Sequence, residues 1–211
     1  MADPKKMYYD KRGEIMVKNL TNHGFEAYYC ENKEAALAKA LELIPKGATV
    51  GWGGAMSAQQ IGLLDAMNDG EYNAIDRDKA PNPEEREKAM RACLQADYFI
   101  TGANAMSIDG QMVNIDGVGN RVAAIVYGPK YVVVIAGMNK VTDSLEAAVT
   151  RARTVAAPMN KQRFPLQTPC AVTGVCGNCK TGGICNQLLI TRNSKPIGRI
   201  KVILVGEELG L

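Results

Sequence analysis

Four cysteines lie close together near the end of the 211-residue chain, in the segment PCAVTGVCGNCKTGGICN. They are spaced C-x5-C-x2-C-x5-C and are Cys170, Cys176, Cys179 and Cys185. Thiolates bind soft metals, and the intervening glycines allow the positive φ angles that wrap a loop around a metal centre. The sequence therefore predicts a metal or cluster site at these four cysteines.

Three interpretations of this motif compete. An iron–sulfur cluster, for which we expect the 4Fe–4S type, uses four thiolates and accepts irregular loop spacing. Structural zinc, the alternative cofactor, more often uses two separated C-x2-C pairs, and only one is present. Buried or disulfide-bonded cysteines are the third interpretation. Disulfides are disfavoured because the opening MADPKKMYYDKRGE is charged and does not resemble a secretion signal. Cys30 and Cys93 lie in apolar segments and are expected to be small core residues.

A glycine turn is the first candidate ligand site outside the cysteines. The segment VGWGGAMS runs from a predicted strand through Gly53 and Gly54 toward a helix that begins near Ser57. Exposed amides at a helix start favour phosphate or carboxylate, and Ser57 adds a hydroxyl donor. The segment matches neither a Walker loop nor G-x-G-x-x-G. Close packing at the glycines is the alternative interpretation.

The second candidate is the polar stretch from 101 to 121, which starts at the carboxyl end of a predicted strand, where open α/β sheets bind ligands. Ile108-Asp109-Gly110-Gln111 is typical of a hairpin turn. Arg121 could clamp an anion, and Asp109 and Asp116 are the candidate catalytic bases. Asx turns are the alternative for Asn114 and Asp116. The candidate ligand-binding residues of this stretch are Thr101, Gly102, Asn104, Asn114, Gly117, Gly119, Asn120 and Arg121.

Strands and helices alternate along the chain, which predicts an α/β fold with a mainly parallel sheet layered with helices. The runs ADYFITG and KYVVVIAG have the continuous apolar character of parallel strands that are buried on both faces. Helices are expected over 4–22, after an Asn32 cap, over 57–67, from an Asn82 cap to about Ala96, and from a Thr142 or Asp143 cap to about Ala157.

Three regions are expected. Residues 1–157 form the α/β body, 158–186 form a proline-containing linker and the cysteine loop, and 187–211 supply C-terminal strands that complete the body. The strands QLLITRN and GRIKVILV flank Ser194–Gly198, so a terminal hairpin is expected.

Composition excludes several classes of protein. A net charge of +3 and 6% aromatic residues argue against nucleic-acid binding. No apolar run reaches membrane-spanning length, so we expect a soluble, cytoplasmic protein. His23 is the single histidine and precedes Gly24, a helix stop, so it is predicted to be a helix-end cap rather than a catalytic base.

The run TGANAMSIDGQMVNIDGVGNRVAAIVYGPKYVVVIAGMNKV resembles the lactate-utilisation (LUD) domain family. The resemblance extends to VGWGGAMS before it and to AAPMNKQRFPLQTPC and GRIKVILVGEELG after it. It implies a fold similar to the clan of ribose-phosphate isomerases, glucosamine-phosphate deaminases and coenzyme A transferases. It also implies a component of an iron–sulfur system that oxidises L-lactate to pyruvate with iron–sulfur partner subunits. The catalytic glutamate of the coenzyme A transferases has no counterpart here, and the four cysteines depart from the usual small subunit.

The leading hypothesis is therefore an oxidoreductase component that binds a small carboxylate or phosphate-bearing ligand between the two polar segments. A stand-alone isomerase- or transferase-like enzyme with structural zinc is the second hypothesis. The third is a non-catalytic, ligand-sensing or assembly subunit.

Overall fold

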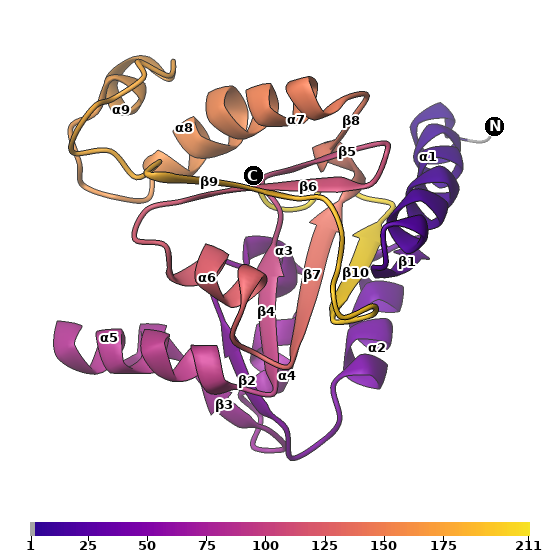
Figure 1. Cartoon of the computed structure of the whole chain (residues 1–211), viewed down its shortest axis with the longest axis horizontal. Helices are drawn as coiled ribbons and strands as arrows, with labels where there is room; N and C mark the ends of the chain where they lie inside the picture. Colours follow the sequence, from indigo (N-terminus) through magenta and orange to yellow (C-terminus); the bar gives the residue numbers. More distant parts are fainter. Residues whose placement is uncertain (1–2) are drawn as a thin grey trace.

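The computed structural model describes residues 3–211 and is built around a six-stranded sheet (Figure 1). Every neighbouring pair of strands in this sheet is parallel. The predicted α/β fold with a mainly parallel sheet is confirmed. In spatial order the strands are β1 (Glu26–Cys30), β10 (Ile200–Val205), β7 (Tyr131–Gly137), β4 (Tyr98–Gly102), β2 (Thr49–Trp52) and β3 (Asn73–Ile75).

Helices cover both faces of this sheet, because alternate residues of its central strands face opposite sides. Val132 and Val134 of β7 belong to one apolar cluster, whereas Val133 and Ile135 belong to the other. The first cluster includes residues of α1 (Pro4–Asn22) and α6 (Asn120–Val126). The second includes residues of α2 (Lys33–Leu43), α3 (Met56–Gln60) and α4 (Leu63–Met67). Burial on both faces explains the continuous apolar runs in the sequence.

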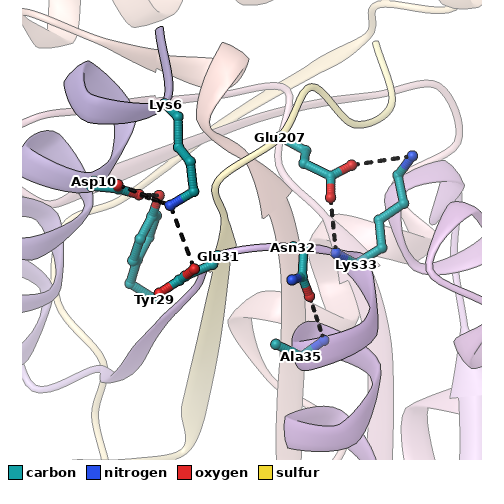
Figure 2. Close-up of polar contacts among 8 residues, drawn as sticks. All are labelled: Lys6, Asp10, Tyr29, Glu31, Asn32, Lys33, Ala35 and Glu207. Carbon is teal, nitrogen blue, oxygen red and sulfur yellow. Dashed lines mark hydrogen bonds and ion pairs between the residues drawn. The ribbon is translucent and has the colours of Figure 1, made fainter. Parts of the chain in front are cut away.

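The start of α2 shows how local side chains define an element (Figure 2). Asn32 accepts a hydrogen bond from the Ala35 amide at 2.9 Å, which confirms the predicted cap. Glu207, just after β10, accepts a hydrogen bond from the Lys33 amide at 3.1 Å and pairs with Lys33 Nζ at 3.3 Å. These contacts satisfy the first amides of the helix and join its start to the end of a distant strand.

Polar contacts also hold α1 against β1. The Tyr29 hydroxyl donates to Asp10 at 2.7 Å, and Lys6 pairs with Asp10 at 3.0 Å and with Glu31 at 3.4 Å (Figure 2). Gly13 lies where the helix meets the Tyr29 ring, and a Cβ atom there would come within 2.3 Å of it. The absence of a side chain at Gly13 therefore allows the helix to approach the strand.

A second, four-stranded sheet stands beside the first and was not anticipated. Its order is β8 (Val141–Thr142), β5 (Ala105–Ser107), β6 (Gln111–Asp116) and β9 (Gln187–Thr191). Strands β5 and β6 are antiparallel, and Gly110 between them has a φ of 97°. The predicted hairpin turn at Ile108–Gln111 is confirmed. Helix α7 (Leu145–Arg151) packs on this sheet.

The predicted terminal hairpin is wrong, because its two strands join different sheets. Strand β9 pairs antiparallel with β6, whereas β10 lies between β1 and β7. All six residues of β10 are buried, so this strand needs neighbours on both sides and cover on both faces. Strand β9 has exposed positions and lies at the edge of the second sheet.

Two helices differ from their predicted limits. The helix expected over 57–67 is interrupted between α3 and α4, where Gly62 has a φ of 81°. The helix expected to begin at Thr142 or Asp143 is capped by Ser144, whose hydroxyl accepts from the Ala147 amide at 3.2 Å, because Thr142 belongs to β8.

This last helix also continues beyond Pro158, where the sequence predicted that it would end. After α7, a π-helical stretch over Ala152–Ala156 leads into α8 (Ala157–Lys161). Pro158, which has no amide donor, is the second residue of α8 and lies directly after the π-helical stretch, where the hydrogen-bond pattern of the helix changes. Only the residues after 161 and before α9 (Pro169–Thr173) are irregular, so the expected linker is shorter than predicted.

Helix α5 (Pro83–Ala92) begins at an Asn82 cap, as predicted, and lies to the side of the core (Figure 1). Short 3-10 helices occur at Arg77–Lys79, Cys93–Gln95 and Met138–Lys140. None of the helices within residues 3–211 is long and apolar enough to cross a lipid bilayer.

Candidate functional site

A cavity of about 470 Å³, here called the anion cavity, lies at the carboxyl ends of β2 and β4. It brings both polar segments of the sequence together. Thr101, Asn114 and Gly119 adjoin lining residues in the chain but do not line the cavity themselves. The predicted residues that line it are Gly53, Gly54, Ser57, Gly102, Asn104, Asp116, Gly117, Asn120 and Arg121.

Asp109 does not line this cavity. It lies in the turn between β5 and β6, where its carboxylate accepts hydrogen bonds from the Ser107 hydroxyl and from Gln111 Nε2. The Ser107 bond, above all, holds the pKa of Asp109 below its ordinary value. In the described structure Asp109 stabilises a turn, so its predicted role as a base has no support from its position.

Asp116 lines the cavity, but backbone amides donate hydrogen bonds to both oxygens of its carboxylate. Oδ1 accepts from the Gly117 amide at 2.8 Å, and Oδ2 accepts from the amides of Arg121 at 2.9 Å and Val122 at 3.1 Å. Helix α6 has Gly119 at its N-cap position and no side-chain cap from that residue. Asp116 therefore caps α6 from outside, which is the Asx-type alternative for this residue.

Arg121 is held at the cavity wall with part of its guanidinium free. Its Nη2 group donates to Asn104 Oδ1 at 2.9 Å and to the Ile115 carbonyl. Within residues 3–211, its Nε and Nη1 groups have no hydrogen-bond partner. Gly53 allows the side chain to pass, since a Cβ atom at Gly53 would lie 3.1 Å from Arg121 Cγ. Desolvation lowers the pKa of Arg121.

Most of the positive charge in this cavity comes from residues that the sequence did not single out. Arg77 contributes a buried Nε atom that has no hydrogen-bond partner among the described residues. Its nearest carboxylate contact, to Asp78, is 3.8 Å long, and burial lowers the pKa of Arg77. Because an unpartnered buried donor is costly, this side chain is suited to an anionic ligand. The lining contains two carboxylates, Asp78 and Asp116, against five basic residues, Arg77, Arg86, Arg121, Lys140 and Arg163.

Lys140 is the most unusual of these basic residues. It ends the 3-10 turn after β7 and is 4% exposed. Its Nζ donates to the Ser57 hydroxyl at 3.1 Å and to the Ala103 carbonyl at 3.0 Å. Desolvation, then the nearby positive charges of Arg151 and Arg121, lower the pKa of Lys140 to about 7. The sequence signal was a lysine just beyond the apolar run KYVVVIAG.

The predicted contribution of a helix start at the glycine turn is not supported. Helix α3 has five residues, so few aligned peptide dipoles act at its start. Ser57 is buried and accepts from Lys140, so its hydroxyl orients that amine. The excess of positive charge in the cavity therefore comes from side chains, and Arg77 and Arg121 carry donors that have no hydrogen-bond partner within residues 3–211.

A second cavity of about 350 Å³, here called the cysteine cavity, is lined by all four predicted metal ligands, Cys170, Cys176, Cys179 and Cys185. Cys170 lies in α9, and the others follow it on a segment that extends past the end of the second sheet (Figure 1). Cys185 is exposed as a residue, yet its thiol is partly desolvated. This desolvation, and then repulsion from the other three cysteines, raises the pKa of Cys185.

All four thiols line one cavity, which matches the number of thiolates that an iron–sulfur cluster uses. Across residues 3–211, however, no three cysteine, histidine or carboxylate side chains are grouped closely enough to hold a metal ion. The structure therefore brings the predicted ligands near one another but does not itself form a metal site. Cys30 and Cys93 are buried in the two apolar clusters, which confirms the prediction that they are core residues.

The two cavities are neighbours. Ile115 and Ile184 line both of them. Asn186, next to Cys185, donates from its amide to the Asp116 carbonyl and from Nδ2 to the Gly117 carbonyl, both at 2.8 Å. The cysteine segment is therefore bonded directly to the loop that lines the anion cavity.

His23 lies away from both cavities. It is the C-terminal cap residue of α1, and its Nδ1 atom lies 2.8 Å from Asn193 Oδ1. The predicted position of His23 at a helix end is confirmed.

The family model described as the LUD domain matches residues 13–205. A DUF162 family protein from Deinococcus radiodurans has a similar structure, with a TM-score of 0.55 and 13% identity over 93% of this chain and 98% of that chain. The delta subunit of eIF2B from Chaetomium thermophilum has a TM-score of 0.38 at 15% identity, over 66% of this chain and 57% of that one. A 5-methylthioribose 1-phosphate isomerase from Pyrococcus horikoshii also has a TM-score of 0.38, at 14% identity over 76% and 51%. These two scores are too low to establish a shared fold. No curated protein is significantly similar in sequence. The match over most of its length shows that the chain belongs to the LUD domain family.

Proposed function

We propose that this LUD-domain chain is a component of an iron–sulfur-dependent system that oxidises a small organic acid, L-lactate, to pyruvate. Membership of the family supports the link to lactate utilisation. The excess of basic side chains in the anion cavity supports binding of a small carboxylate. In this role the protein acts with iron–sulfur partner subunits.

The observation that carries the proposal is the shared wall between the two cavities. Ile115 and Ile184 line the anion cavity on one side and the cysteine cavity on the other. Asn186 joins the cysteine segment to the loop at Asp116 and Gly117. A ligand in one cavity and a cofactor in the other would therefore be adjacent, as electron exchange between them requires.

The cysteines would hold the cofactor. Cys170, Cys176, Cys179 and Cys185 supply the four thiolates that an iron–sulfur cluster needs. Such a cluster supplies one-electron transfer. Desolvation and repulsion from the other cysteines disfavour the thiolate of Cys185 and raise its pKa, and the positive charge of bound iron would offset this cost as the thiol protons are released.

The arginines would bind the carboxylate. Arg121 offers Nε–H and Nη1–H, which have no hydrogen-bond partner within residues 3–211, and the guanidinium of Arg77 lines the same cavity, so both side chains can make charge-assisted hydrogen bonds to a carboxylate. Asn104 fixes Arg121 by accepting from Nη2, and Gly53 leaves room for the side chain. Binding of an anion also compensates the desolvation of both guanidinium groups.

Calorimetric titration tests this binding. L-lactate, pyruvate and inorganic phosphate are titrated into wild type, Arg77→Ala and Arg91→Ala. The last is a matched control, because Arg91 lies on the exposed face of α5 and pairs with Glu87. Arg77→Ala is expected to weaken carboxylate binding about ten- to a hundredfold, the value of one charge-assisted contact. Equal affinities in all three proteins would contradict the assignment of the cavity.

A further inference from the structure

We propose that Lys140 is a nucleophile that forms an imine with the carbonyl group of a small 2-oxo acid bound in the anion cavity. This chemistry is additional to the proposed electron transfer and needs no cofactor in the cysteine cavity. Lys140 lines the anion cavity together with Arg77 and Arg121, so amine and carboxylate-binding groups share one space.

The hydrogen bonds of Lys140 suit a neutral amine. A neutral amine has two N–H donors and one lone pair, whereas an ammonium group has three donors. Nζ donates to the Ser57 hydroxyl and to the Ala103 carbonyl, which uses two donors. Nζ has no third hydrogen-bond partner among residues 3–211, which leaves one position for the lone pair of a neutral amine.

The charges around Lys140 also favour the neutral form. None of the ion pairs formed within residues 3–211 includes Lys140. The charged groups that act on it are the guanidinium groups of Arg151 and Arg121, and burial acts in the same direction. The carboxylates of the cavity, Asp78 and Asp116, instead interact with Arg77 and with the backbone of α6. A desolvated lysine beside other cations is the arrangement that activates an amine for attack on carbonyl groups.

The backbone holds the amine in place. Gly210 has a φ of 64°, and a Cβ atom there would lie 2.8 Å from Lys140 Nζ and 2.7 Å from Ser57 Oγ. The chain at Gly210 therefore closes over the amine and limits its movement. Nζ is fixed between Ser57, Ala103 and Gly210 and is not free to move into solvent, as an exposed lysine would be.

The reaction balances without an oxidant or reductant. The Nζ lone pair forms a bond to the carbonyl carbon, and the carbonyl π pair moves to the oxygen, which takes up one of the two Nζ protons to give a carbinolamine. The nitrogen then forms the C=N bond as the hydroxyl leaves and takes the remaining Nζ proton to form water. Overall, one amine and one ketone or aldehyde give one imine and one water. Arg77 and Arg121 would hold the carboxylate beside the reacting carbonyl, which makes 2-oxo acids the favoured class of ligand.

Lys161 provides an internal comparison. It is 2% exposed, and its Nζ donates to the Phe164 carbonyl at 2.7 Å. It lines the cysteine cavity, not the anion cavity. If burial alone made a lysine reactive, both lysines would form the imine, whereas the proposal predicts an imine at Lys140 only.

Reductive trapping tests the proposal on the full chain. Wild-type protein is incubated at neutral pH with pyruvate or glyoxylate and sodium cyanoborohydride, which delivers hydride to the imine carbon and leaves a stable secondary amine. Peptide mapping by mass spectrometry then locates the adduct. At pH 7 an ordinary lysine is neutral in only about one molecule in a thousand or fewer, so adduct at Lys140 is expected to exceed that at any other lysine at least about tenfold.

Three further measurements make the result decisive. Lys140→Met should abolish the adduct, and inorganic phosphate should protect Lys140 by competing for the arginines. Arg91→Ala, on the exposed face of α5, should leave trapping unchanged, and because the reaction uses no cofactor it can be confirmed in protein whose cysteines hold no cluster. Adducts spread over exposed lysines with Lys140 unmodified, or equal labelling of Lys140 and Lys161, would overturn the proposal.

Discussion

Replacement of Lys140 by methionine should change how the stability of the protein depends on pH. The pKa of Lys140 is lowered to about 7 in the folded protein, whereas in the unfolded chain it returns to about 10.5. Between these values the unfolded chain holds a proton that the folded protein has lost, so folding stability rises with pH. Below pH 7 both states are protonated, and the full cost of a buried charge is present.

The size of this effect follows from the difference between the two pKa values. Each pH unit between them contributes about 1.36 kcal/mol, so wild type should gain about 3–4 kcal/mol relative to Lys140→Met between pH 7 and pH 10. Methionine has a similar length and no charge, and the other titrating groups cancel in the difference between the two proteins. Below pH 6 the difference should be constant.

Urea unfolding at several pH values measures this difference. The fluorescence of Trp52, buried in β2, reports unfolding, and linear extrapolation gives the free energy of unfolding for each protein. A difference between wild type and Lys140→Met that stays within about 0.5 kcal/mol from pH 6 to pH 10 would refute the reasoning. It would show that Lys140 keeps its ordinary pKa, and the imine proposal would lose its chemical basis.

Substitutions at three other residues separate structural from functional roles. Asp116→Ala should destabilise the protein by about 2–4 kcal/mol in urea unfolding, because three amides lose their acceptor. Asp116→Asn keeps one oxygen acceptor and should cost only about 1 kcal/mol. Equal losses of stability in the two variants would contradict the capping role. Arg121→Ala should weaken phosphate binding in calorimetry about ten- to a hundredfold while the protein stays folded; an unfolded variant would favour a purely structural role for Arg121. In anaerobically prepared protein, Cys176→Ser should increase proteolysis within 160–190 only, because binding of a cofactor orders that segment; unchanged protection would show that packing holds it.

The central sheet could be predicted from the sequence because the continuous apolar residues within each central strand show that both faces of the strand are buried. The apolar runs of β4 and β7 indicate cover on both faces, and this requires a layered parallel sheet. The pairing of β9 with β6 could not be predicted in the same way. Two strands that are adjacent in the sequence with a turn between them favour a hairpin locally. The two strands separate because β9 pairs with the free edge of β6, whereas β10 fills the position between β1 and β7.

The site was predictable only in part, for a similar reason. Gly53, Asn104 and Arg121 lie in segments whose polar and glycine-rich composition is visible in the sequence, and they do meet in one cavity. Arg77 and Lys140 were missed because each looks like an ordinary surface residue until its burial is known. The burial of these two side chains depends on residues that are distant in the sequence, so the residues next to them in the chain do not reveal it.

Iron and acid-labile sulfide analysis of anaerobically purified protein tests whether the four cysteines hold a cluster. We expect about four iron and four sulfide per chain, with broad visible absorption that bleaches on reduction and is lost in Cys176→Ser. Exposure to air can destroy a cluster on an accessible segment, so purification and analysis must both exclude oxygen. Stoichiometric zinc without sulfide, or four free thiols after anaerobic reconstitution with iron and sulfide, would show that the cysteines do not hold an iron–sulfur cluster.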